Sequence, residues 1–201
     1  MTMAMDDAMT AALDTAWRLL AEAAIDRHSP MHTLVVAGID EAGLPDARTM
    51  VLRAVDRAAR TLRFHTDARS SKCAALDGAR VSVLAYHPGE AIQLRIAGRA
   101  RIITTGPEVD RVWAASTPFA RRIYLVTAAP GTALPAPASG LPAWAEGHRP
   151  TETELVPARA NFAMLYIDVA AIDWLHLAHG GHRRARLSSN DAGWSGAWLV
   201  P

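Results

Sequence analysis

The spacing of apolar residues changes from a helical to a strand period near residue 30. From Leu13 to Ala24, apolar residues recur every three to four positions, which predicts an amphipathic helix over about residues 6–24. The segment Ile25–Pro30 breaks this pattern, because proline disfavours helical geometry in the residue before it. Residues 1–30 are therefore expected to form an N-terminal helical segment ahead of a β-rich body.

Most of the remaining chain consists of short apolar or alternating runs bounded by Gly, Pro, Asp or Asn. Such runs predict antiparallel strands joined by turns. The predicted strands span residues 32–39, 47–55, 61–66, 80–86, 91–100, 162–169, 174–177, 184–187 and 194–200. Short helices are predicted at 70–76, 108–116 and 119–126. The Pro- and Ala-rich stretch 128–150 is expected to be a long internal loop.

This succession of elements predicts one domain over residues 1–201 with a mainly β (α+β) fold. Many short strands, with one helix before them and two in the middle, favour a small antiparallel β-barrel with helical additions. No internal repeat is present in the sequence. We expect the 128–150 loop to lie within this domain and not to separate two domains.

Composition and charge narrow the class of protein. Half of the residues are hydrophobic, 20% are charged, and the formal net charge is +1. Such a balance creates no field that would attract nucleic acid or an anionic membrane, so neither is expected as a partner. The sequence has no secretory signal pattern and no apolar run long enough to span a bilayer. Cys73 is the single cysteine and permits no intrachain disulfide, and these features together favour a cytoplasmic location.

Two segments, residues 48–53 and 65–72, combine cationic and hydroxyl side chains with apolar strand residues. Phosphate binding needs charged donors and several hydrogen bonds in one place, and the start of a short helix adds amide donors. The side chains that meet this need are Arg48, Thr66, Ser71 and Lys72. The alternative is that these groups are solvated charges at strand ends, and the residues alone leave both interpretations open.

The histidines and the cysteine give no pattern typical of a metal site. His176, His179 and His182 lie three residues apart, but no second cysteine completes a zinc-ligand set. Cys73 follows Lys72 at a predicted helix start, where a thiol pKa is lowered, although an isolated cysteine is more often a small buried residue. We therefore predict no metal site.

Pieces of the sequence occur in an order that resembles the pyridoxamine 5'-phosphate oxidase family. That family has an Arg-Thr strand, a Phe/Tyr-x-Thr strand end, a Ser-x-Lys helix start, a Gln-x-x-x-x-Gly strand and a tail with tryptophan and arginine. The corresponding pieces are Arg48–Arg53, Phe64–Thr66, Ser70–Lys72, Gln93–Gly98 and Asp173–Pro201. The similarity covers roughly residues 33–201. It implies a split β-barrel whose two FMN sites lie at the interface of a homodimer.

The resemblance also implies which residues contact FMN. The residues expected near the phosphate and the ribityl chain are Arg48, His65, Thr66, Ser71 and Lys72. The residues expected beside the isoalloxazine ring are Thr49, Met50, Val51, Leu52 and Gln93. The strand contributes backbone contacts, and Gln93 suits a polar ring edge that would be costly to leave unpaired. Trp174 and either Arg184 or Arg186 are expected to reach this site from the partner subunit.

The chain departs from the family where the family binds its substrate. Arg53 stands where the family has a lysine, and guanidinium and ammonium groups differ in geometry and hydration. The helical stretch 111–122 has no counterpart of the family's Tyr–Arg–Ser pattern, and the basic run from Arg183 lacks the expected histidine. Arg53 and Arg183 are the candidate substrate contacts, and no catalytic residue is predicted.

The function that the resemblance implies is an FMN-dependent oxidoreductase, which transfers hydride between a small organic substrate and the flavin. One alternative is an FMN-binding redox sensor or storage module without turnover, which the missing substrate residues favour. Another is a split barrel that binds haem or a deazaflavin, which the His-rich stretch His176–His182 favours. Fold alone does not decide between these functions.

Overall fold

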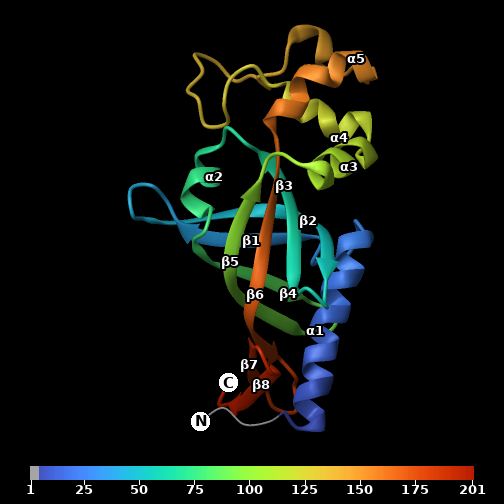
Figure 1. The fold of residues 1–201 in the computed structure, drawn as a ribbon. Helices are drawn as coiled ribbons and strands as arrows, with labels where there is room; N and C mark the ends of the chain where they lie inside the picture. Colours follow the sequence, from blue (N-terminus) through green and yellow to red (C-terminus); the bar gives the residue numbers. More distant parts are fainter. Residues whose placement is uncertain (1–4) are drawn as a thin grey trace.

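Six antiparallel strands close into a barrel at the centre of the computed structural model, which describes residues 5–201 (Figure 1). The strands are β1 (Thr33–Ile39), β2 (Pro45–Asp56), β3 (Thr61–Asp67), β4 (Arg80–His87), β5 (Ile92–Ile103) and β6 (Phe162–His176). Their order is β3-β2-β1-β4-β5-β6, and pairing of β3 with β6 completes the ring. The predicted antiparallel, mainly β fold is confirmed.

Strand β6 is longer than the barrel and carries the C-terminal hairpin, β7 (Arg183–Asn190) and β8 (Gly193–Leu199). Its first half pairs with β3, its second half pairs with β7, and β5 runs along both halves. The prediction of separate strands at 162–169 and 174–177 was therefore wrong, because ladders on both sides hold the intervening residues extended. At the β5–β6 irregularity, a side chain on Gly98 would collide with the carbonyl oxygen of Asp168, so only glycine fits.

Helix α1 (Asp7–Ile25) confirms the predicted N-terminal helix. The Asp6 carboxylate caps it by accepting a hydrogen bond from the Met9 amide at 2.7 Å. Its apolar face, which includes Trp17, is buried against β2, β6 and the hairpin. The indole of Trp17 meets that of Trp194 edge to face at 6.3 Å. Helix α1 therefore joins the barrel and the hairpin through one apolar core.

A helical cap lies between β5 and β6 at the opposite end of the barrel from the hairpin (Figure 1). It consists of α3 (Pro107–Ala115), α4 (Pro118–Arg122), η1 (Ile123–Leu125), η2 (Ala143–Ala145), α5 (Glu152–Leu155) and η3 (Val156–Asn161). The predicted helix at 108–116 is confirmed, whereas the one at 119–126 ends at Arg122 and tightens into η1. The sequence analysis missed α5, although Thr151 and Glu154 form the capping box that marks its start. A second apolar core around Trp113 and Phe162 supports the cap.

Helix α2 (Ser71–Leu76) lies between β3 and β4, as predicted, with Ser70 at its N-cap. The Ser70 hydroxyl caps no amide and instead accepts a hydrogen bond from Lys72 Nζ at 3.0 Å. No helix within residues 5–201 has the length and apolar character needed to cross a membrane.

Candidate functional site

A cavity of about 610 Å³ opens where β2 and β3 approach α2 and the segment that follows η1. We call it the first cavity, and its size is typical of a small-molecule site. The residues of the sequence-predicted site that line it are Arg48, Thr49, Met50, Val51, Arg53, His65, Thr66 and Lys72. Residues from two separate stretches of sequence thus meet at one concave surface.

Two cations of the first cavity lack a full set of partners. One terminal nitrogen of Arg48, Nη2, pairs with Asp46, but the other, Nη1, is buried and has no hydrogen-bond partner within residues 5–201. Among the described residues, Lys72 Nζ donates only to the Ser70 hydroxyl. Burial lowers the pKa of Arg48 and, with help from the nearby Arg48 charge, that of Lys72. Partly desolvated positive charges facing a cavity favour an anionic ligand.

Two uncharged polar groups beside these cations are also unsatisfied. Thr66 Oγ1 and His65 Nε2 are buried and accept or donate no hydrogen bond in the described part of the chain. Burial, followed by the positive charges of Arg63 and Arg53, lowers the pKa of His65 to about 3, so its imidazole is neutral at physiological pH. A buried polar group without a partner costs about 1–3 kcal/mol. These atoms are therefore suited to a ligand that supplies hydrogen-bond acceptors and donors.

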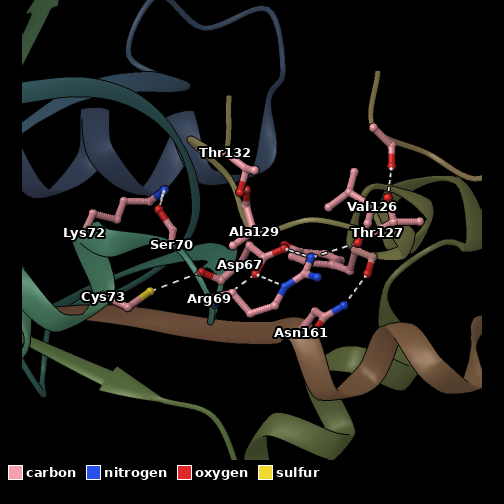
Figure 2. A network of polar contacts seen from close by, with 12 residues as sticks. Asp67, Arg69, Ser70, Lys72, Cys73, Val126, Thr127, Ala129, Thr132 and Asn161 are labelled. Carbon is pink, nitrogen blue, oxygen red and sulfur yellow. Dashed lines mark hydrogen bonds and ion pairs between the residues drawn. The ribbon is translucent and has the colours of Figure 1, made fainter. Parts of the chain in front are cut away.

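The opposite wall of the first cavity is formed by residues 126–140, which we call the flap. Its lining residues include Thr127, Pro130 and Leu134. The two ends of the flap are joined, because the Thr127 amide donates to the Gly140 carbonyl at 3.0 Å. Figure 2 shows the root of the flap beside the end of β3, where Arg69 meets the Val126 carbonyl oxygen. This flap is the first part of the predicted 128–150 loop.

Two further predicted residues, Leu52 and Ser71, do not line the first cavity, whereas Arg53 lines it from a β-bulge. Leu52 is fully buried inside the barrel and does not line the cavity, and its amide donates to the His32 carbonyl oxygen. Ser71 is exposed in the first turn of α2 and does not line the cavity. Arg53 is the extra residue where the β2–β3 register shifts between Leu52 and Ala54. Such a bulge re-aims a side chain, and Arg53 lines this cavity and a neighbouring one.

The remaining predicted residues lie near the hairpin end of the barrel and do not reach the first cavity of their own chain. They are Gln93 on β5, Trp174 on β6, and Arg183, Arg184 and Arg186 on β7. Trp174 is buried and packs edge to face on Trp198 at 6.4 Å. Arg184 donates to both carboxylate oxygens of Asp173, at 3.0 and 2.9 Å. Arg183 lies 3.5 Å from the Nδ1 atom of His176.

A second cavity of about 540 Å³ adjoins the first and shares Arg53, His65, Ile123 and Tyr124 with it. Arg53, Arg63 and Arg111 all line the second cavity, and no acidic residue of the described chain does. Burial raises the pKa of the Tyr124 phenol, which stays protonated. The sequence analysis missed Arg63, Arg111 and Tyr124. The alternation of Arg63 and His65 on one face of β3 was a signal that could have identified Arg63.

Cys73 has no reactive character in this structure. Its thiol is buried and donates to the Asp67 carbonyl oxygen at 3.2 Å. Burial raises the pKa of the thiol despite the neighbouring Lys72. Of the two interpretations of Cys73, the structure therefore supports the small buried residue.

The closed antiparallel barrel, its N-terminal helix and its helical cap are features of the split β-barrel fold. A family profile described as "Pyridoxamine 5'-phosphate oxidase, FMN-binding domain" matches residues 14–104, from α1 to the end of β5. This match identifies residues 14–104 with the pyridoxamine 5'-phosphate oxidase-like FMN-binding domain family. No curated protein matches the chain.

Solved structures share the architecture over almost the whole chain. A pyridoxamine 5'-phosphate oxidase-related, FMN-binding protein from Nostoc punctiforme is 26% identical, with a TM-score of 0.68 over 96% of this chain and 95% of that one. PhzG from Burkholderia lata, solved with tetrahydrophenazine-1-carboxylic acid, is 19% identical, with a TM-score of 0.68 over 94% and 92% of the two chains. A general stress protein 26-related protein from Clostridium acetobutylicum is 10% identical, with a TM-score of 0.53 over 90% and 95%. The last two comparisons support the fold alone.

Proposed function

We propose that the protein binds FMN in the first cavity and acts as an FMN-dependent oxidoreductase on a small anionic substrate. The observation that carries this proposal is the set of buried, unpartnered polar atoms on Arg48, His65 and Thr66, which face one cavity in a chain of this family. A phosphate would satisfy the Arg48 guanidinium, the Thr66 hydroxyl and the Lys72 ammonium together. The side chains of the first cavity therefore fit the phosphate of FMN.

The rest of the first cavity suits a flat aromatic ring with polar edges. Met50, Val51 and Leu134 supply apolar surface, and Thr49 and Val51 lie on a strand that can offer backbone groups. Bound FMN would supply the hydride-accepting centre. The chain itself would hold the phosphate, orient the ring over β2 and exclude water by means of the flap.

We further propose that the site is completed by a second copy of this chain. Cross-strand pairing places Thr49, Val35, Leu84, Arg95, Asp173 and Arg186 in one row across β2, β1, β4, β5, β6 and β7. Directly paired residues share a sheet face, so this row runs along the outside of the barrel. Leu84, near its middle, is 41% exposed, and Tyr86 on the same face is 46% exposed. Such exposed apolar side chains suit an interface.

A two-fold axis near Leu84 would place the Arg186 end of one chain against the Thr49 end of its partner. Arg186 is exposed and makes no hydrogen bond or ion pair in the described residues, whereas Arg184 is held by Asp173. Of the two arginines, Arg186 is therefore the one free to contact a flavin across the interface. Gln93, which pairs with Tyr86, would approach from the same end.

The second cavity supports an anionic substrate. The positive charges of Arg53, Arg63 and Arg111 meet there without a lining carboxylate, and Arg63 Nε is buried and unpartnered. Because the cavity shares Arg53 and His65 with the first, a substrate anchored there would extend toward the flavin. Fixed guanidinium groups bind carboxylate and phosphate groups in preference to neutral ones.

The first test is a visible absorption spectrum of freshly purified protein, followed by denaturation to identify any released cofactor. A yellow protein that releases FMN supports the proposal. A haem Soret band, a deazaflavin spectrum, or a colourless protein that also fails to bind added FMN would overturn it. FMN binding without turnover of any amine or nicotinamide donor would leave the sensor or storage alternative.

The substrate class has its own test in the FMN-loaded protein. Pyridoxamine 5'-phosphate and pyridoxamine differ only in the phosphate, so they form a matched pair of probes for reduction of the flavin without oxygen. We expect Arg111→Gln to raise the half-saturating concentration of the phosphorylated probe about tenfold and to leave that of pyridoxamine unchanged. Arg57→Gln, on the surface beside Asp14, is the control. Equal effects on both probes, or none, would contradict an anion site in the second cavity.

A further inference from the structure

Arg69 connects the end of β3, which lines the first cavity, to the flap (Figure 2). Its Nε and Nη2 atoms donate to the two carboxylate oxygens of Asp67, at 3.0 and 2.7 Å. Nη2 also donates to the Val126 carbonyl oxygen at 3.0 Å. The Asp67 side chain is only 9% exposed and accepts the Arg69 amide as well, at 2.9 Å. One guanidinium group thus joins the end of β3 to the root of the flap.

The flap has few other attachments. Within residues 5–201, its hydrogen bond from Arg69 is the only one that links residues 126–140 to the β3–α2 segment. The Thr127–Gly140 bond closes the flap on itself, and most residues between these two are exposed. A loop with exposed residues and few contacts has low local stability. The position of the flap is therefore set mainly at its root.

The segment that contains Arg69 also contains Thr66 and Lys72, two of the groups proposed to bind the FMN phosphate. Thr66 directly precedes Asp67, and Lys72 follows in the first turn of α2. The thiol of Cys73 donates to the Asp67 carbonyl oxygen, which fastens α2 to the same point. The Ala68 amide donates to the Asn161 carbonyl oxygen at 2.8 Å, and Asn161 Nδ2 donates to the Tyr124 carbonyl oxygen at 2.8 Å. The β3–α2 segment is thus rigidly placed, and Arg69 reaches from it to the flap.

We propose that Arg69 is a positioning residue, which holds the flap against the first cavity and thereby slows the release of the bound cofactor. The proposal rests on FMN occupying the first cavity. Arginine suits this role because its planar fork satisfies two carboxylate oxygens and a carbonyl oxygen in one arrangement. A lysine would keep the charge next to Asp67 but would lack the fork that also reaches the Val126 carbonyl oxygen.

The experiment compares Arg69→Ala and Arg69→Lys with a matched control, Arg159→Ala. Arg159 makes the same kind of contacts elsewhere: Nε and Nη2 donate to Asp110 at 3.0 and 2.7 Å, and Nη1 donates to the Thr104 carbonyl oxygen at 3.2 Å. It does not line the first cavity. Two quantities are measured: amide hydrogen exchange of residues 126–141 without cofactor, and the rate of FMN dissociation from the loaded protein.

We expect both Arg69 variants to speed exchange at the Thr127 amide and to raise the FMN dissociation rate about tenfold, with Arg159→Ala unchanged in both. We expect Arg69→Lys and Arg69→Ala to change both rates by similar amounts, because the role of Arg69 depends on its forked guanidinium group and not on its charge alone. Unchanged flap exchange or unchanged FMN release in both Arg69 variants would overturn the proposal. So would a full rescue by lysine.

Absence of FMN binding and absence of a role for Arg69 would give different experimental results. If the wild-type protein binds no FMN, the proposed function fails, while hydrogen exchange of the flap still reports whether Arg69 holds it. If the wild-type protein binds FMN and the Arg69 variants release it at the wild-type rate, only the role of Arg69 fails. A variant that does not fold is recognised by loss of protection throughout β5 and β6, and Arg69→Lys then carries the test.

Discussion

The arginine and lysine side chains at the two ends of the barrel differ in how completely they are paired. At the hairpin end, Asp173 is 8% exposed and accepts hydrogen bonds from Arg95 at 2.6 Å and from Arg184. Burial raises the pKa of Asp173, but the two arginines outweigh that effect and hold it below its usual value. At the cavity end, Arg48 and Lys72 are partly desolvated and have no comparable network. The fully paired Arg184 stabilises the fold, whereas Arg48 and Lys72, which are only partly paired and face a cavity, indicate a ligand.

The largest expected effect comes from breaking the proposed dimer, in which the hairpin end of one chain meets the cavity end of its partner. Leu84→Asp places a charge at the middle of the outward row, where burial without a partner is costly. We expect the dimer to dissociate and FMN affinity to fall by roughly a hundredfold, because each site loses the partner's contribution. Light scattering and FMN titration measure the two effects.

Ile25→Asp is the control for this variant, because Ile25 is 88% exposed at the end of α1 and lies outside the row. A dimer that survives Leu84→Asp, or a wild-type protein that is monomeric with FMN bound, would contradict the composite site.

Arg48→Ala and Arg184→Ala are expected to act in opposite ways. Removing Arg48 should weaken FMN binding by roughly thirtyfold with little loss of stability, because its buried Nη1 atom has no partner within residues 5–201 and its other partner, Asp46, is exposed. Removing Arg184 should lower the free energy of unfolding more than removing Arg48 does, because buried Asp173 loses a bidentate partner. FMN titration and urea denaturation distinguish the two. A stability loss for Arg48→Ala equal to that for Arg184→Ala would show that the two ends do not differ.

Arg186→Ala tests whether Arg186 and Arg184, both on β7 at the hairpin end, have different roles. Because the exposed Arg186 side chain has no partner among residues 5–201, we expect no change in stability and an FMN affinity reduced by about fivefold to tenfold. The same FMN titration on Arg184→Ala should show a smaller change. If Arg184→Ala weakens FMN binding more than Arg186→Ala does, the assignment of the two arginines is reversed.

The smallest expected effect concerns the neutral His65 imidazole. Its pKa is about 3 in the folded protein against an ordinary 6.5, so below pH 6.5 the unfolded chain binds a proton that the folded chain does not. Stability is therefore full above that pH and falls as the pH drops toward 3. Between about pH 7 and pH 6, apoprotein should lose about 0.7 kcal/mol of stability relative to His65→Gln. Urea denaturation at both pH values measures this difference, and parallel curves would show that His65 titrates normally.

Local patterns in the sequence were sufficient to predict most elements. The 3.6-residue period from Leu13 to Ala24 led to α1, and alternation in residues such as Thr61–Thr66 led to the strands. The same local reasoning split β6 into two strands, because its middle residues are held extended by neighbouring ladders rather than by their own pattern. Helix α5 was overlooked although its capping box is local, so that miss was not a limit of the sequence.

The site was predictable only in part, because it too depends on contacts between segments that are distant in the sequence. Arg48 and Lys72 stand out as cations beside hydroxyl groups and apolar strands, and the resemblance to a family gave their order a meaning. Alternation with His65 could have identified Arg63, but no local pattern pointed to Arg111. Nothing in the sequence showed that these two arginines meet, because they come from β3 and α3 and come together only when the cap packs on the barrel. Arg53 reaches both cavities because a bulge turns it, and bulges depend on pairing between strands.

By itself, the sequence determined the helix, most of the strands, the balanced charge and the candidate phosphate-binding groups, because each depends on neighbouring residues. Only the tertiary structure decided that β3 pairs with β6, which joins residues 61–67 to residues 162–168 and closes the barrel. It alone also decided which cations are paired and which face a cavity. Those outcomes depend on contacts between distant segments, and the free energy of such contacts is not encoded in any local pattern.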